Sequence, residues 1–135
     1  MSIGIGGRCR KIAEDNDCVI YEYLAYNLNE PEFKNDTQIF DGMILIDRNC
    51  LIEPEIRKKI RRMPSGKRKI FTKTIVRDVP IYELINSGKI QIENCSHTWK
   101  CMPNGVDYIA YRLCDLIFKR YQETGAMPFS FSINF

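Results

Sequence analysis

The stretch from Arg57 to Arg77 constrains this chain more than any other part of the sequence. It holds ten of the 20 Lys and Arg residues and no Asp or Glu. Because unpaired cations are almost never buried, this stretch must lie at the surface. Residues 1–56 carry five basic and eleven acidic residues and residues 78–135 carry five and six, so the net charge of the whole chain is only +3. The molecule is electrically polar rather than uniformly basic.

Length and composition predict one packed domain. A chain of 135 residues with 44% hydrophobic residues can bury roughly two-thirds of the surface that its unfolded form exposes. Residues 1–7 lack the basic start and apolar run of a signal peptide, and no segment approaches the ~20 apolar residues that span a bilayer. We therefore expect a cytoplasmic protein that makes no membrane contact, needs no cofactor, and keeps its six cysteines reduced.

Hydrophobic periodicity predicts an α+β fold. Alternating residues in 18–28 indicate the second arm of a hairpin, whose tyrosines would suit a partner if one face is left open. Apolar residues at helical spacing in 104–123 indicate a long helix capped by Asn104. We expect residues 1–135 to form a single domain, an antiparallel or mixed sheet packed by the long C-terminal helix and one or two short helices. Strands are predicted at 8–13, 18–28, 39–46 (with a bulge at Gly42), 70–76, 90–93 and 127–135, and a short helix at 80–88.

The first half of the basic stretch is predicted to be a short cationic helix. Glu53-Pro54-Glu55 places acidic residues and a proline where the start of a helix tolerates them. Ile56, Ile60 and Met63 then share one helical face, and Pro64-Ser65-Gly66 would end the helix.

The cysteines and the single histidine allow two kinds of chemistry. Two thiolates and an imidazole within 95–101, with Cys114 as a fourth ligand, resemble a zinc ligand set, and His97 could activate Cys50 or Cys114 as a nucleophile. The spacing is not that of paired C-x-x-C zinc modules, no oxyanion-stabilising motif is visible, and lone core cysteines usually act as small hydrophobes. We therefore expect no catalytic residue and no metal, and name as the only candidate ligands Cys95, His97, Cys101 and Cys114.

Two charged surfaces are candidates for binding a partner. The first is basic and would suit an acidic protein or, along 57–77, the phosphates of a nucleic acid. Phe71 is the only aromatic residue in that stretch, which is little for a platform that stacks single-stranded bases. The basic set is Arg57, Lys58, Lys59, Arg61, Arg62, Lys67, Arg68 and Lys69. The alternative acidic set is Asp15, Asp17, Glu22, Tyr23, Glu30, Glu32 and Asp36.

The layout of the chain resembles that of the small α+β immunity proteins of bacterial toxin–immunity systems. The features that carry the resemblance are Tyr21-Glu22-Tyr23 in an early hairpin, the strand Phe40-Asp41-Gly42-Met43-Ile44-Leu45-Ile46, and one long late helix. The resemblance implies a bacterial protein that binds and neutralises a cognate toxin domain without doing chemistry. A non-enzymatic protein-binding module is thus the leading expectation, a nucleic-acid-binding protein the second, and a Cys-dependent enzyme the third.

Overall fold

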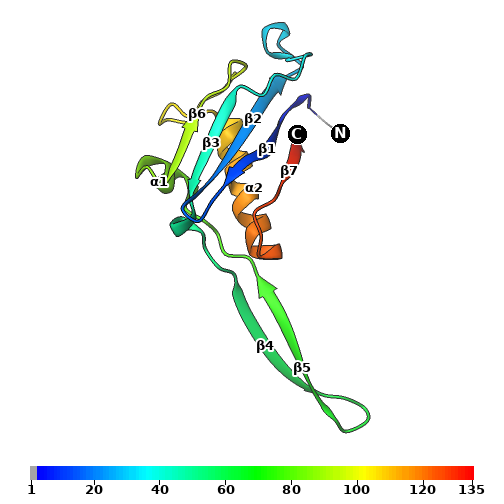
Figure 1. Ribbon diagram of the computed structural model, residues 1–135. Coiled ribbons are helices and arrows are strands. Elements are labelled where there is room, and N and C mark those ends of the chain that lie inside the picture. The colour runs from blue at the N-terminus through cyan, green and yellow to red at the C-terminus, as the bar shows by residue number, and fades with distance from the viewer. Residues whose placement is uncertain (1–2) are drawn as a thin grey trace.

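The computed structural model describes residues 3–135, and its centre is a five-stranded antiparallel sheet. The strands lie in the order β6-β3-β2-β1-β7 (Figure 1). Together with its helices, the sheet confirms the α+β class expected from the sequence, and each of its strands overlaps a predicted one. The bounds are β1 Ile5–Glu14, β2 Cys18–Asn27, β3 Gly42–Asp47, β6 Ile90–Glu93 and β7 Ser130–Asn134.

The hairpin of β1 and β2 begins the sheet. Its turn is held by Asp15, whose Oδ1 accepts hydrogen bonds from the backbone N–H groups of Asp17 and Cys18 at 2.7 and 2.8 Å. The register shifts by one residue between Lys11 and Ala13, which is where the bulge of this sheet lies. The bulge predicted at Gly42 is wrong, because Gly42 pairs with Tyr23 without a shift in register. A Cβ at Gly42 would overlap the Tyr23 ring, so the absence of a side chain is what this position requires.

The long helix α2 (Tyr108–Thr124) lies across one face of the sheet, as Figure 1 shows. Asp107 caps the helix rather than the predicted Asn104, and its Oδ1 accepts a hydrogen bond from the backbone N–H of Ile109 at 3.0 Å. Gly125 ends it with φ +77°, the left-handed conformation that glycine adopts most easily. The covered face holds the core, which includes Ile44, Ile46, Ile90, Ile109, Leu113, Ile117, Phe118 and Ile133.

Two of the β2 tyrosines considered as a possible exposed surface, Tyr21 and Tyr23, belong to this core. Tyr21 and Tyr23 are both 0% exposed, because they point from β2 toward α2. The Tyr21 hydroxyl donates to the backbone oxygen of Pro128 at 2.5 Å. Buried tyrosines need such partners, so they stabilise the fold and do not offer a surface.

Short elements complete the body of the molecule. Helix α1 (Ile81–Asn86) confirms the helix predicted at 80–88, and Ile81 packs into the core. Two 3-10 turns, η1 (Pro31–Phe33) and η2 (Arg48–Cys50), lie at opposite ends of the sheet. Within residues 3–135, no helix has both the length and the apolar character needed to cross a membrane. Residues 1 and 2 of the segment 1–7, where no signal peptide is expected, lie outside the described part of the chain.

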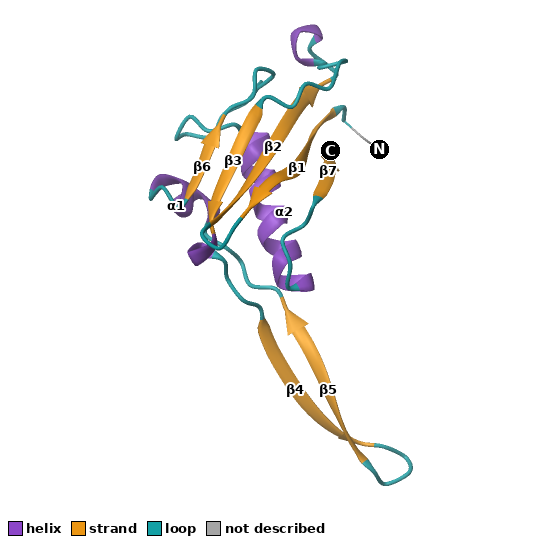
Figure 2. Cartoon of the chain, viewed as in Figure 1, coloured by secondary structure: helices purple, strands orange, loops and turns teal. Residues whose placement is uncertain are grey.

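Strands β4 (Glu55–Arg62) and β5 (Arg68–Ile75) form a second, two-stranded antiparallel sheet. Figure 2 shows it as a ribbon that projects from the end of the five-stranded sheet. The helix predicted at 56–63 is therefore wrong, whereas the strand predicted at 70–76 is confirmed. The four-residue spacing of Ile56 and Ile60 suits a helix but also puts both residues on one side of a strand. A helix would in addition have placed like charges four residues apart, which destabilises it.

Candidate functional site

The ribbon of β4 and β5 is the most exposed structured part of the molecule. Every residue from 56 to 62 and from 68 to 74 is exposed, and the two strands make their main contacts with each other. Strands of eight residues extend about 26 Å at the usual rise of a β-strand. The ribbon can therefore reach a partner while the body of the molecule remains at a distance.

The register of the ribbon sorts its side chains onto two different faces. Residues paired across an antiparallel ladder point the same way, and successive residues of a strand alternate. The pairs Arg57–Lys73, Lys59–Phe71 and Arg61–Lys69 thus lie on one side. We call this side the cationic face; its members are Arg57, Lys59, Arg61, Lys69, Phe71 and Lys73.

The opposite side of the ribbon combines apolar and charged residues. Its central pair is Ile60–Ile70, with Lys58–Thr72 and Ile56–Thr74 toward the base and Arg62–Arg68 toward the tip. We call this side the isoleucine face. The predicted basic set is thus brought together on the ribbon but divided between its two faces. Four members lie on the cationic face (Arg57, Lys59, Arg61, Lys69), three lie on the isoleucine face (Lys58, Arg62, Arg68), and Lys67 lies in the turn.

Turn residues at the tip explain why the chain reverses here. Met63 N–H donates to the backbone oxygen of Lys67 at 2.7 Å, and Gly66 N–H donates to that of Met63 at 2.9 Å. Pro64 follows the first residue of this turn, and Gly66 has φ +82°. The sequence Pro-Ser-Gly that was expected to end a helix is therefore a hairpin turn with proline and glycine in favoured positions.

Charge on the ribbon is almost unneutralised. Among the described residues, Arg57 is the only ribbon cation with a carboxylate partner: its Nε lies 2.9 Å from Glu55 Oε1. The hydrogen bond from Arg57 lowers the pKa of Glu55. Three cross-strand pairs consist of two cations each, namely Arg57–Lys73, Arg61–Lys69 and Arg62–Arg68. Like charges directly opposite each other destabilise a ladder, so the free ribbon carries electrostatic repulsion that an anion would relieve.

The cationic face has a hollow whose lining includes one aromatic ring. It measures about 460 Å³ and is lined by Phe71, Thr72 and four cations of this face, Arg57, Lys59, Arg61 and Lys73. The Lys69 ammonium lies 5.4 Å from the centroid of the Phe71 ring. Phe71 and Lys73 were absent from the basic set predicted from the sequence. Counting alternate residues outward from the Pro64–Gly66 turn would have found them.

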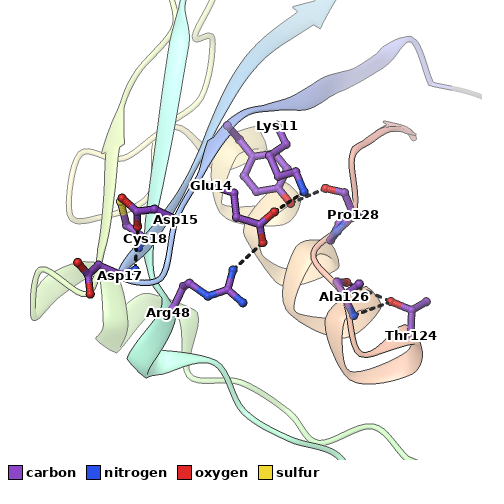
Figure 3. Close-up of polar contacts among 10 residues, drawn as sticks. Lys11, Glu14, Asp15, Asp17, Cys18, Arg48, Thr124, Ala126 and Pro128 are labelled. Atoms are coloured by element: carbon purple, nitrogen blue, oxygen red, sulfur yellow. Dashed lines mark hydrogen bonds and ion pairs between the residues drawn. The ribbon is translucent and has the colours of Figure 1, made fainter.

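The acidic set predicted as an alternative is not one surface. Asp15 and Asp17 lie in the β1–β2 turn, where Asp15 binds backbone N–H groups that lower its pKa (Figure 3). Beside them, Glu14 accepts hydrogen bonds from Lys11 at 2.6 Å and Arg48 at 2.5 Å, and these lower its pKa. The carboxylates at this end are thus largely engaged within the molecule.

The rest of that set lies elsewhere. Glu30, Glu32 and Asp36 follow β2 at the other end of the sheet, around η1. Glu22 points to the open face of the sheet and pairs with Arg10, and Tyr23 is buried. The structure therefore does not bring these seven residues together.

The open face of the sheet also holds cations, but they have internal partners. Arg8 donates to Gln38 Oε1 at 2.8 Å, and the Arg10 guanidinium lies 4.0 Å from the centroid of the Phe40 ring. A hollow of about 530 Å³ lies between these residues and β7. Because Arg10 already pairs with Glu22, less free charge remains here than on the ribbon.

The four residues named as the only candidate metal ligands do not converge. Cys114 is 0% exposed on α2, Cys101 is exposed, and Cys95 Sγ lies 3.6 Å from Asp107 Oδ2 in a buried network. Across residues 3–135 no three His, Cys, Asp or Glu side chains are grouped so that they could hold a metal ion. All six cysteines are free thiols.

The same geometry places the candidate thiol nucleophiles in unfavourable surroundings. Burial raises the pKa of Cys114 and of Cys50, which keeps both as thiols and lowers their reactivity. Cys50 Sγ donates to the backbone oxygen of Asp47 at 3.0 Å, and His97 Nδ1 lies 3.0 Å from Ser96 Oγ. In the described chain, neither thiol hydrogen-bonds to His97.

Comparison of the chain with protein-family models, with curated proteins and with solved structures found no match. Its function must be inferred from its own residues.

Proposed function

We propose that this protein binds nucleic acid through the cationic face of the β4–β5 ribbon. Lys and Arg that neutralise phosphates release counterions and provide most of the affinity that does not depend on sequence. A two-stranded β-ribbon also fits the major groove of a duplex, so the shape is compatible with paired as well as unpaired strands. This is the second of the functions expected from the sequence, and the geometry of the ribbon is what favours it.

The observation that carries the proposal is that cations lie directly opposite cations across the ladder. Arg57–Lys73 and Arg61–Lys69 repel each other on one face, and Lys59 lies between them. Charged residues on sheet edges also discourage aggregation, which would account for scattered lysines. Protection against aggregation does not account for five cations on a single face around one aromatic ring. A polyanion lying along that face would be attracted to these cations and would offset the repulsion between them.

The experiment compares two triple variants that each remove three positive charges. K59Q/R61Q/K73Q changes the cationic face, and K58Q/R62Q/R68Q changes the isoleucine face. Binding to labelled single-stranded and duplex oligonucleotides is measured by fluorescence anisotropy between about 50 and 200 mM salt. Thermal unfolding of each variant checks that the body of the molecule is intact.

We expect the wild-type affinity to fall steeply with salt. The cationic-face variant should lower the slope of log K against log salt by about 2 to 3, because each lost phosphate contact contributes about 0.7–0.9. The isoleucine-face variant should lower it by less than about 1. Equal losses in the two variants, or no salt-dependent binding by the wild type, would refute the proposal.

A protein partner is the second candidate, and it agrees with the immunity-type function expected from the sequence. The observation in its favour is the isoleucine face, on which Ile56, Ile60 and Ile70 are 59%, 64% and 62% exposed. Apolar side chains flanked by cations would suit an apolar groove with acidic edges, such as a toxin domain could offer. I60S/I70S should abolish capture of such a partner and leave oligonucleotide binding unchanged.

A further inference from the structure

We infer that Phe71 stacks on an unpaired base and that the ribbon therefore prefers single-stranded over duplex nucleic acid. This inference rests on the proposed function and specifies its ligand. Single-strand binders combine a cationic track for the backbone with aromatic rings on which bases stack, and stacking tolerates any sequence because every base has a π-face.

The position of Phe71 within the cationic face is central. It pairs across the ladder with Lys59, and the next pairs on the same side are Arg57–Lys73 toward the base and Arg61–Lys69 toward the tip. Side chains that are two residues apart on a strand lie about 6.6 Å apart. Five cations thus surround one ring within a short distance, so phosphates on both sides of a stacked nucleotide would meet positive charge.

The surroundings of the ring leave it accessible. Phe71 is 41% exposed and forms part of the 460 Å³ hollow, whose other charged lining residues are Arg57, Lys59, Arg61 and Lys73. The Lys69 ammonium lies 5.4 Å from the centroid of this ring. An aromatic residue in this place packs against no core and contributes little to folding. Its exposed area is therefore free to cover a base.

Stacking separates single strands from duplexes for a physical reason. Bases inside a duplex already stack on their neighbours and offer only their edges in the grooves. A base of a flexible single strand offers a whole face. The cations alone would bind both polymers, so the preference depends on Phe71.

The experiment uses the full chain and two probes. One is an oligothymidylate of about 12 nucleotides, a length within the site sizes of known single-strand binders, and the other is a mixed-sequence duplex of the same length. F71L keeps an apolar side chain but removes the π-face. I70L, on the isoleucine face, is the matched control. F71W keeps an aromatic ring and adds a fluorescent reporter, while the natural Trp99 has its indole nitrogen buried.

We expect F71L to weaken oligothymidylate binding about 5- to 150-fold, since stacking contributes about 1–3 kcal/mol for each base. Duplex binding should change less than about twofold, because a stacked duplex offers no base face to the ring. I70L should leave both affinities unchanged. F71W should bind oligothymidylate at least as well as the wild type, and its added fluorescence should be quenched on binding.

Two results would overturn the inference: an F71L affinity for oligothymidylate equal to that of the wild type, or equal losses of oligothymidylate and duplex binding. Failure of the proposed function has a different signature. If K59Q/R61Q/K73Q binds both probes as the wild type does, the cationic face binds no nucleic acid. If that variant loses binding and F71L does not, the face binds phosphates but no base stacks on Phe71.

Discussion

The five-stranded sheet and the two-stranded ribbon are built from similar strands but differ in what covers them. In the sheet, α2 buries one face, so Tyr21, Tyr23 and Ile44 are 0% exposed. In the ribbon, neither face is covered, and Ile60 and Ile70 remain more than 60% exposed. Isolated two-stranded hairpins are marginally stable in water, whereas a sheet with a covered apolar face is stable by itself. Stability therefore lies in the body of the molecule, and the ribbon is free to be specialised for a partner.

The two regions also handle charge differently. In the body, charged side chains pair with opposite charges, as Arg10 does with Glu22 and Arg48 with Glu14. On the ribbon, cations face cations. Such an arrangement lowers stability in the free protein, which agrees with the proposed role of the ribbon in binding a polyanion.

The largest expected contrast comes from truncating one isoleucine in each region. Ile44→Ala removes a fully buried side chain and should lower the free energy of unfolding by about 2–5 kcal/mol. Ile60→Ala removes a side chain that is 64% exposed and should change it by less than about 0.5 kcal/mol. Denaturant unfolding measures both. A loss above about 2 kcal/mol for Ile60→Ala would show that the ribbon packs against the body.

A second contrast concerns glycines. Gly42→Ala would push a Cβ into the Tyr23 ring, which cannot move away because its hydroxyl donates to Asp107 Oδ2 at 2.8 Å. The expected loss in the free energy of unfolding is about 1–3 kcal/mol.

Gly66→Ala meets no atom within 4 Å, but its φ of +82° costs a side chain about 1–2 kcal/mol. That strain should open the tip, seen by faster amide exchange there, without lowering the melting temperature of the body. A lowered melting temperature in Gly66→Ala would contradict the independence of the two regions.

The smallest expected effect is a pH dependence confined to the body. Burial raises the pKa of Asp107, although Tyr23 and Ile109 donate hydrogen bonds to its carboxyl group. The folded state then holds this proton at a pH where the unfolded state has lost it. The corresponding stability is full below the carboxyl pKa of the unfolded chain and is lost as pH rises through the raised value.

Asp107→Asn should remove this dependence, because an amide can still cap α2 and bond Tyr23. Relative to the wild type, the variant should become more stable as pH rises from about 4 to neutrality. Denaturant unfolding across pH measures the difference, with the exposed Asp36→Asn as the control for losing one carboxylate. Parallel profiles for the wild type and Asp107→Asn would mean that Asp107 does not bind a proton on folding.

Much of the fold could be predicted because local patterns had one interpretation. The alternation in 18–28, the helical spacing in 108–121 and the proline and glycine around α1 each fit a single kind of element. The segment 56–63 did not, because Ile56 and Ile60 satisfy both helical and strand spacing. The pairing of this segment with β5 decided the matter. The site was predicted only as a charged stretch, since Phe71 and Lys73 join it through cross-strand pairing.

The sequence alone determined that ten cations without a carboxylate must remain at the surface and that a sheet and a late amphipathic helix must form the core. Both follow from properties of single residues and short periods: the cost of burying charge, and the alternation of side chains along a strand or helix. The tertiary structure decided which cations share a face, that Tyr23 is buried while Phe71 is not, and that the acidic residues are split between two ends of the sheet. These depend on register and on which face a neighbouring element covers, and those are set by contacts between residues far apart in the chain.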